Sequence, residues 1–271
     1  MTPPGGPGSR DREPLLRLRG VHKRYGAFEA VRGIDLEVYP GEVFGFLGPN
    51  GAGKTTTIRM VAGVLEPSAG EVRLGGFDLG REPERAKALL GYIPDRPYLY
   101  EKLSGREFLR FVAGLWGAAG PAAEERGERL LRLFSLEEWG DELIESYSHG
   151  MRQKLLITSA LLHQPRLIVV DEPMVGLDPR SARILKDLFR AFADEGGAVF
   201  LSTHTLEVAE ALCDRIAILS RGEVIARGTM AELRALGEGE TDARLEDIFL
   251  RVTGSGEMAA VVAHLREALE G

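Results

Sequence analysis

The sequence predicts an α/β fold in which helices cover both faces of a mainly parallel β-sheet. The first observation is an alternation of apolar runs typical of buried strands with stretches of helical periodicity, in the order Leu167–Asp171, Arg180–Glu195, Ala198–Ser202, Leu206–Cys213 and Arg215–Leu219. The second is a strand, a glycine-rich turn and a helix nearer the N-terminus, over Glu42–Leu47 and Lys54–Leu65. Since parallel strands need a crossover connection between them, the alternation favours a parallel sheet.

The chain divides into a tail, a main domain and an appendage. Its 271 residues are enough to bury a substantial core. Residues 1–14 hold four prolines and three glycines and predict a disordered tail. Residues 15–235 predict the main domain. Residues 236–271 predict a small appendage with a helix that carries Met258, Val261, Val262 and Leu265.

A block of helices interrupts the alternation of strands and helices. The stretch from about 100 to 160 predicts only helices. One begins at a capping box, in which Ser104 caps the first turn and Glu107 reaches back to it. Pro121 opens a second helix that runs to about Phe134.

Composition and charge exclude several classes of function. Acidic residues outnumber basic ones 41 to 34, for a net charge of -7, so we expect no nucleic acid as the main partner. The single cysteine permits no internal disulfide, which fits a reducing compartment. No apolar run approaches the length of a membrane span, and the N-terminus has no apolar signal segment. We therefore expect any role at a membrane to depend on a partner.

A phosphate-binding loop follows the first predicted strand. Gly48-Pro49-Asn50-Gly51-Ala52-Gly53-Lys54-Thr55 matches the pattern G-x-x-x-x-G-K-[ST] in full, and Thr56 continues into the predicted helix. The glycines let backbone N–H groups point at phosphate oxygens, and the helix N-terminus adds the positive end of its dipole. We expect Lys54 to reach the β- and γ-phosphates and Thr55 to coordinate Mg²⁺. On its own the loop predicts only a nucleoside triphosphate as the ligand, as in P-loop nucleoside triphosphatases (NTPases). Asn50 is the only asparagine in the chain, so the usual Asn-Lys-x-Asp reader of guanine is absent.

Two acids end the apolar strand at Leu167–Asp171. We expect Asp171 to hold Mg²⁺ through water, and Glu172 to act as general base or to orient the attacking water. Alternation of side chains along the strand would separate the two roles. Alone, the pair is equally well explained as an acidic turn after a core strand. A complete phosphate loop upstream favours the functional interpretation.

With these motifs, the chain resembles the nucleotide-binding subunit of ATP-binding cassette (ABC) transporters, over about residues 15–235. The deciding motif is Tyr147-Ser148-His149-Gly150-Met151-Arg152-Gln153-Lys154, which is similar to a signature whose usual form is Leu-Ser-Gly-Gly-Gln. In this family two nucleotide-binding domains pack head to tail. The resemblance implies that Ser148, His149, Gly150 and Met151 of one domain close over the γ-phosphate held by the other. It also implies a P-loop NTPase (RecA-like) core, a small antiparallel β subdomain and an inserted helical subdomain at about 96–160.

Further residues match the family in order. Tyr25 resembles the aromatic that stacks on adenine. Gly176-Leu177-Asp178 resembles the loop through which the two domains contact each other, and His204 the histidine that touches the γ-phosphate. Without the resemblance, each of these residues would be interpreted as part of an ordinary strand end or turn.

Several positions depart from the family pattern. Asp95 stands where the family usually has a glutamine between the core and the helical block. The resemblance implies a place for it near the metal, where it can accept from a metal-bound water but cannot donate. His149 replaces a glycine, and Met151 replaces a glutamine. The Met-Arg-Gln run and Leu245–Leu250 are similar to the branch that exports drugs and polysaccharides.

The resemblance implies a Mg²⁺-dependent ATPase with Lys54, Glu172 and His204 as catalytic residues. It would drive transport, as an exporter, through a separate transmembrane permease at the cytoplasmic face of the membrane. Its second nucleotide-binding domain would be another copy or a related chain. Tyr98, Leu99 and Tyr100 are candidates for the contact with the permease, although core packing is an alternative.

Two other interpretations remain open from the sequence. One is a non-transport ABC ATPase that acts on ribosomes or DNA. Such relatives commonly join two cassettes or insert a long coiled coil, whereas this chain has one cassette. The other is a binding module with degenerate sites, which the presence of Lys54, Asp171, Glu172 and His204 argues against.

Overall fold

The computed structural model describes residues 13–174, 176–235 and 245–253. Most of the predicted tail, up to residue 12, lies outside the described residues. So does the predicted helix with Met258, Val261, Val262 and Leu265.

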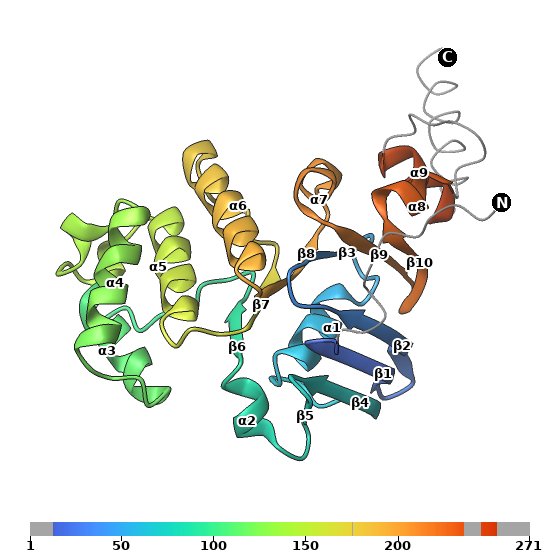
Figure 1. Ribbon diagram of the computed structural model, residues 1–271, viewed down its shortest axis with the longest axis horizontal. Coiled ribbons are helices and arrows are strands. Elements are labelled where there is room, and N and C mark those ends of the chain that lie inside the picture. The colour runs from blue at the N-terminus through green and yellow to red at the C-terminus, as the bar shows by residue number, and fades with distance from the viewer. Residues whose placement is uncertain (1–12, 175, 236–244, 254–271) are drawn as a thin grey trace, which may run out of the picture.

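A six-stranded sheet forms the centre of the molecule. Its strands are β3 (Val43–Leu47), β6 (Leu90–Ile93), β7 (Leu167–Asp171), β8 (Ala198–Thr203), β9 (Arg215–Ser220) and β10 (Glu223–Thr229). They lie in the order β10-β9-β3-β8-β7-β6 (Figure 1), and all neighbours are parallel except β10, which runs antiparallel to β9. Every residue of β3, β7 and β8 is buried, as expected for strands covered on both faces. The predicted parallel sheet is confirmed.

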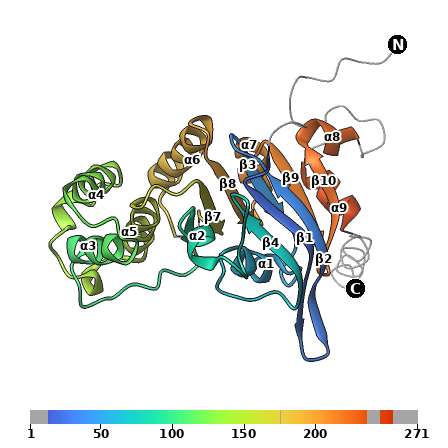
Figure 2. The same ribbon diagram turned by 60° about the horizontal axis from the view of Figure 1, so that its bottom comes forward.

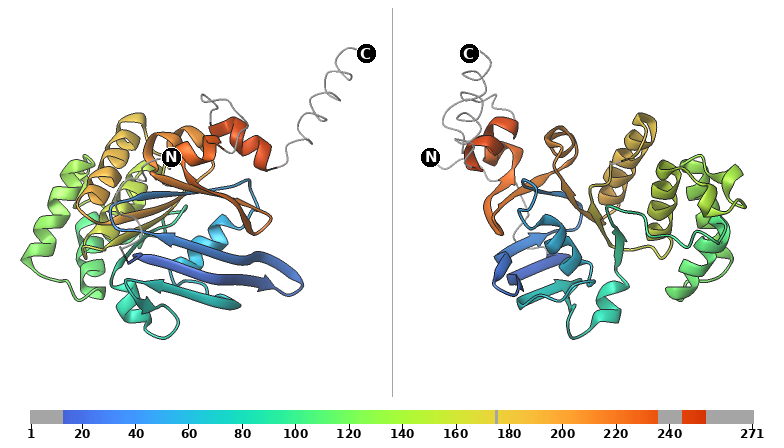
Figure 3. Two further views of the ribbon diagram at one scale, coloured as in Figure 1. Left: turned by 45° about the vertical axis from the view of Figure 1, so that its right-hand side comes forward. Right: turned by 180° about the vertical axis from the view of Figure 1, so that it is seen from behind.

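A second, antiparallel sheet packs beside the first. Its strands are β1 (Leu16–Tyr25), β2 (Phe28–Val38), β4 (Ala69–Leu74) and β5 (Phe77–Asp78), in the order β2-β1-β4-β5. Helix α1 (Lys54–Val61) lies between the two sheets and contacts β2, β7 and β8 (Figure 3). It ends at Val61 rather than at the predicted Leu65. Gly63 causes this end, because it takes a left-handed conformation and donates its N–H to the Met60 carbonyl.

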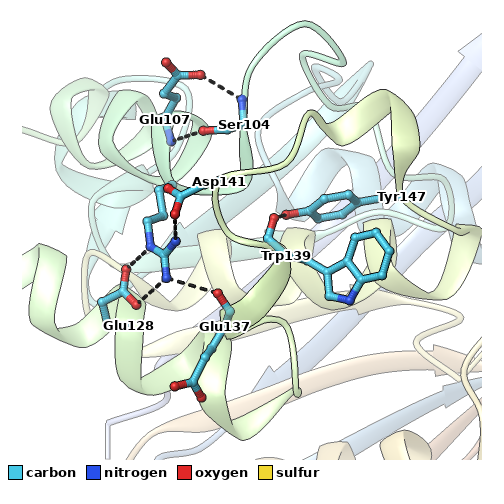
Figure 4. A network of polar contacts seen from close by, with 8 residues as sticks. Ser104, Glu107, Glu128, Glu137, Trp139, Asp141 and Tyr147 are labelled. Atoms are coloured by element: carbon cyan, nitrogen blue, oxygen red, sulfur yellow. Dashed lines mark hydrogen bonds and ion pairs between the residues drawn. The ribbon is translucent and has the colours of Figure 1, made fainter.

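Helices inserted between β6 and β7 form one end of the molecule (Figures 1 and 2). They are α3 (Gly105–Leu115), α4 (Pro121–Leu133), two short 3₁₀ helices, η1 (Glu137–Trp139) and η2 (Ile144–Ser146), and α5 (His149–Leu161). The predicted capping box of α3 is confirmed. Ser104 accepts from the Glu107 N–H at 3.3 Å, and Glu107 accepts from the Ser104 N–H at 2.8 Å (Figure 4). The stretch is not wholly helical, since Ser104 forms an isolated antiparallel bridge with Leu143.

The remaining helices are α2 (Pro83–Lys87), α6 (Pro179–Asp194), α7 (Leu206–Leu212), α8 (Met230–Ala235) and α9 (Leu245–Val252). Both α6 and α7 contact β3 and β8 on the face opposite α1. None of the described helices combines the length and the apolar character needed to cross a membrane.

Alternate residues of the central strands feed two apolar cores. On the α1 side, Phe44 and Phe46 of β3 pack against Phe200 of β8, with ring centroids 5.9 Å and 5.3 Å away. On the other side, Leu47 and Leu201 belong to the core that contains α6. Close packing on both faces fixes the strand ends relative to one another. The side chains that follow these strands are therefore held on a rigid base.

Candidate functional site

The residues of the candidate site follow three adjacent strands and lie at one edge of the sheet. Strand β8 lies between β3 and β7. The phosphate loop follows β3, Glu172 follows β7 and His204 follows β8. Since all three strands are parallel, these residues emerge together at the carboxyl edge, where ligands bind in open α/β sheets.

A cavity of about 440 Å³ brings most of the predicted nucleotide residues together. Its lining comes from the β1–β2 hairpin, the phosphate loop and the ends of β7 and β8, through Tyr25, Phe28, Ala30, Asn50, Gly51, Gly53, Lys54, Thr55, Thr56, Glu172 and His204. Among the described residues, no member of the signature motif lines this cavity. One chain therefore builds only part of the site that the resemblance implies.

The phosphate loop needs its glycines for two different reasons. At Gly48, a Cβ would lie 2.4 Å from the Leu219 carbonyl oxygen, so the close approach of two backbones excludes a side chain. Gly53 has a φ of +108°, which other residues rarely adopt. Within the described chain no side chain caps α1, and its first turn holds no acid. The N–H groups of that turn thus remain for an anion.

Lys54 lies folded back inside the loop. Only 8% of the residue is exposed, and its ammonium donates to the carbonyls of Gly48 and Pro49 at 2.7 Å and 3.2 Å. Burial lowers the pKa of Lys54 from its ordinary value, while the carboxylates of Glu172 and Asp171 act in the opposite direction. The positive charge is therefore held within the loop, where phosphate oxygens would neutralise it.

Asp171 is the last residue of β7, and its two carboxylate oxygens have different surroundings. The residue is 1% exposed, and the Ser202 hydroxyl of β8 donates to Oδ1. Its Oδ2 is buried and has no hydrogen-bond partner in the described part of the chain. A buried carboxylate oxygen is costly unless it finds a donor or a cation. Asp171 therefore fits a metal-bound water or a metal ion.

Glu172 leaves the strand in an unusual backbone conformation. Its φ is +52°, in the left-handed region, at a cost of about 1 kcal/mol or more for a residue other than glycine. This turn, rather than the expected alternation along a continuing strand, separates Glu172 from Asp171. The carboxylate then reaches the His204 ring, with Nδ1 and Oε1 2.8 Å apart. Two of the three predicted catalytic residues, Glu172 and His204, are thus in direct contact.

Two aromatic rings flank the turn between β1 and β2. Tyr25 and Phe28 are paired across this turn, and both are at least half exposed and line the cavity. Lys23 places its ammonium 5.5 Å from the centre of the Tyr25 ring. The hairpin therefore offers apolar surface to a flat ring beside the phosphate loop.

The signature motif begins α5 on the exposed side of the helical block. Ser148 is the N-cap of α5, and its hydroxyl accepts from the Met151 N–H at 3.3 Å. A Cβ on Gly150 would lie 3.0 Å from the Gly176 carbonyl oxygen. The His149 ring lies beside Gly176. A Cβ on Gly176 would lie 2.3 Å from Cδ2 of that ring. The first turn of α5 thus packs against the predicted dimer-contact loop.

A second contact joins α5 to that loop. Lys154 pairs with Asp178 at 3.3 Å. Asp178 caps α6 by accepting from the N–H and the hydroxyl of Ser181, which hold the pKa of Asp178 well below its usual value. Leu177 packs against the core at its side. The signature and the dimer-contact loop therefore form one connected surface.

Asp95 lies apart from the cavity. It follows β6, the strand beside β7, and it is partly buried but does not line the cavity with Lys54. Its charge and that of Asp171 both act to raise the pKa of Tyr92, which burial brings to about 12. Among the described residues, no group of three or more His, Cys, Asp or Glu side chains is placed to hold a metal ion. A metal at this edge would depend on phosphate oxygens for part of its ligands.

Sequence reasoning missed three residues of the site. Phe28 and Ala30 line the cavity, and Ser202 donates to Asp171. The aromatic pair Tyr25 and Phe28 around a two-residue turn was a usable signal for the first. The contact of Ser202 depends on the pairing of β8 with β7, which no local pattern specifies.

Comparison with known proteins decides the family. The sequence family described as ABC transporter matches residues 31–175. The chain belongs to the ABC transporter family. The linearmycin resistance ATP-binding protein LnrL of Bacillus subtilis is 37% identical over 93% of this chain and 79% of its own length. The daunorubicin/doxorubicin resistance ATP-binding protein DrrA of Streptomyces peucetius is 42% identical, over 86% of this chain and 71% of its own.

The fold of this ABC subunit is shared with a solved structure. A structure described as the ATP-binding subunit of an ABC transporter superposes with a TM-score of 0.84 at 36% identity. It covers 88% of this chain and 99% of its own. The predicted P-loop NTPase fold and the family resemblance are thereby confirmed, and the chain is an ATP-binding subunit of an ABC transporter.

Proposed function

We propose that this subunit hydrolyses ATP in a Mg²⁺-dependent reaction and couples it to export through a separate membrane permease. The observation that carries the proposal is the cavity that unites the phosphate loop with Glu172 and His204. Lys54 and the N–H groups of the loop, with Gly48, Pro49, Asn50, Gly51, Ala52 and Gly53, hold the phosphates. Tyr25 carries the adenine, and Thr55 and Thr56 complete the loop.

Thr55 and Asp171 hold the metal in this proposal. The unpartnered Oδ2 of Asp171 and the position of Thr55 on the cavity wall support their role. Bound Mg²⁺ would neutralise charge that develops on the phosphate oxygens. Asp95 approaches the same edge from β6 and accepts from a metal-bound water.

Glu172 directs the attacking water at the γ-phosphorus. Its carboxylate accepts the water proton or aligns the water, which is the role of such a base in phosphoryl transfer. The 2.8 Å contact with His204 holds the carboxylate over the cavity. His204 and Lys54 stabilise the negative charge that spreads over the phosphoryl oxygens.

A second nucleotide-binding domain completes each site. The signature lies outside the cavity of its own chain, which supports completion by another subunit. Ser148, His149, Gly150 and Met151 of one subunit face the γ-phosphate held by the other, and the free N–H groups at the start of α5 suit an anion. Gly176, Leu177 and Asp178 form the contact between the two domains, which are either two copies or two related chains.

The membrane partner binds the helical end of the subunit. Tyr98 and Tyr100 are 75% and 61% exposed in the connection from β6 to α3, whereas Leu99 packs partly against the core. Exposed aromatic side chains are typical of interaction sites. The subunit would thus lie at the cytoplasmic face of the membrane, held there by its permease. Export, with drugs as one substrate class, is supported by the resistance proteins to which the chain is similar.

Two experiments test this function. Purified protein should hydrolyse ATP with Mg²⁺ and stop when EDTA is added, and equal rates in both conditions would contradict the proposal. Tagged protein from detergent-solubilised native membranes should also retain a stoichiometric multi-span membrane protein, identified by mass spectrometry. Tyr98→Ser with Tyr100→Ser should lose it, whereas Val64→Ser, at an equally exposed apolar residue outside the helical block, should keep it. Ribosomal proteins or nucleic acid in its place would favour the non-transport alternative.

A further inference from the structure

One arginine holds the backbone that leads into the signature. Arg152 lies in the first turn of α5, and its side chain is 28% exposed. Its Nε donates to the Tyr147 carbonyl at 3.2 Å, and Nη2 donates to the Glu145 carbonyl at 3.1 Å. Because Tyr147 directly precedes Ser148, these bonds fix the path of the chain into the helix.

The same guanidinium reaches a third segment. Its Nη1 pairs with the Glu101 carboxylate at 2.6 Å. Glu101 lies in the connection between β6 and α3, next to the exposed Tyr98 and Tyr100. The backbone joins these segments as well, since the Glu145 N–H donates to the Glu101 carbonyl at 3.0 Å. The aromatic connection and the segment before the signature therefore form one hydrogen-bonded unit.

The N-cap of α5 does not fix this geometry alone. The bond from the Met151 N–H to the Ser148 hydroxyl is 3.3 Å long, slightly beyond the usual range for an N–H···O bond. Tyr147 is anchored through its hydroxyl, which donates to the Trp139 carbonyl at 2.6 Å (Figure 4). That bond holds the ring rather than the backbone next to Ser148. The backbone next to Ser148 is held at Tyr147 from two sides: its N–H donates to the Ile144 carbonyl at 3.0 Å, and its carbonyl accepts from Arg152.

We propose that Arg152 is a positioning residue. It sets the orientation of Ser148 at the start of α5, and through Glu101 it makes that orientation depend on the connection that carries Tyr98 and Tyr100. The proposal rests on the proposed function, because it assumes that Ser148 completes the ATP site of a second subunit. Arg152 does not line the cavity of its own chain, so its loss should weaken subunit pairing and leave nucleotide binding intact.

The test measures ATP-dependent dimerisation. The parent is Glu172→Gln, in which bound ATP is not turned over, so that the closed dimer accumulates. Arg152→Lys keeps the charge and loses the planar fork that serves two carbonyls and a carboxylate at once. We expect the dimer dissociation constant, from analytical ultracentrifugation with ATP and Mg²⁺, to rise by about tenfold. The affinity of dilute monomer for a fluorescent ATP analogue should change less than about twofold.

Lys102→Ala in the same parent is the matched control. Lys102 pairs with Glu145 at 2.5 Å and so joins the same two segments, but it is 83% exposed and touches neither Arg152 nor the Tyr147 carbonyl in its hydrogen bonds. Surface ion pairs of this kind contribute little. We expect its dimer to form as in the parent.

The outcomes separate this proposal from the proposed function. If Glu172→Gln itself stays monomeric with ATP, the proposed function fails and this inference falls with it. If the parent dimerises and Arg152→Lys does so equally well, the inference alone is overturned. If Arg152→Lys does not fold, Glu101→Ala replaces it. Dimerisation weaker than in the Lys102→Ala control then supports the proposal, and dimerisation equal to that control overturns it.

Discussion

The two halves of the proposed ATP site are built in different ways. The phosphate loop joins β3 to α1, and α1 is enclosed between two sheets. It presents backbone N–H groups and one almost buried lysine. The signature half begins α5 at an exposed surface, with a long cap bond at Ser148 and ion pairs at Arg152 and Lys154.

This difference indicates that the two halves have different roles. The loop half is fixed by close packing and can bind phosphate without another chain. The signature half is held by hydrogen bonds and partly exposed ion pairs, which are weaker and can be rearranged at lower cost. We infer that the first half binds nucleotide, whereas the second half responds to a partner. The following predictions test this contrast, from the largest effect to the smallest.

The largest effect is expected for Glu172→Gln. An amide can accept a hydrogen bond but cannot take a proton from water, so kcat should fall by about 10³-fold. ATP affinity should stay near the wild-type value, because the loop half is unchanged. Steady-state ATPase assays and ATP titrations measure the two quantities. Full turnover in this variant would remove Glu172 from the reaction.

Lys54→Ala should weaken ATP binding by the phosphate loop. It removes the only ammonium that lies within the loop, and charge-assisted bonds to phosphate are strong. We expect ATP affinity to fall by about 100-fold, measured by isothermal titration calorimetry. Unchanged affinity would argue that ATP binds elsewhere.

Two matched glycine substitutions compare the halves directly. In Gly48→Ala, the new methyl meets the Leu219 carbonyl oxygen at 2.4 Å, so we expect a loss of about 1–3 kcal/mol in the free energy of unfolding and weak ATP binding. In Gly150→Ala, the methyl meets the Gly176 carbonyl oxygen at 3.0 Å, in a loop. We expect a loss below about 1 kcal/mol and normal ATP binding. Urea unfolding measures both, and equal losses would contradict the contrast.

The smallest effect is expected in the pH dependence of stability, at His163, which follows the C-terminal end of α5. His163 donates from Nε2 to the Leu90 carbonyl at 2.9 Å, and its buried Nδ1 has no partner in the described part of the chain. Burial lowers the pKa of His163 below its ordinary value of 6.5, so the unfolded chain binds the proton more readily. The resulting stability is present above pH 6.5 and is lost as pH falls through the lowered pKa.

The free energy of unfolding that is lost through His163 should be below about 1 kcal/mol. Urea unfolding between pH 7.5 and pH 5 measures it, with His163→Gln as the comparison, because an amide can still donate to Leu90 but does not titrate. A stability profile that is equally steep in wild type and His163→Gln would assign the pH dependence to other groups.

Local patterns predicted the buried strands and the helix cap, but not the turn that follows β7. The apolar runs of β3, β7 and β8 predicted buried parallel strands because side chains on both faces of such strands are excluded from water. The capping box at Ser104 was also predicted, since both of its bonds lie within four residues. The left-handed turn at Glu172 was not, because the surrounding strands impose it.

Long-range contacts account for the rest of what was missed. Arg152 and Glu101 are 51 residues apart in sequence, and the Lys154–Asp178 pair joins two different helices. A charged side chain on a helix is usually interpreted as solvated, and nothing within one turn specifies its partner. Only the packing of α5 beside the β6–α3 connection brings these charges together.

The central claim is that a complete ATP site needs residues from two subunits. Two inactive variants test it directly: Ser148→Arg, which blocks the signature, and Lys54→Ala, which disables the phosphate loop. Mixed in equal amounts, they should recover Mg²⁺-dependent ATPase activity, because the intact loop of one meets the intact signature of the other. A mixture that is no more active than either variant alone would contradict the account.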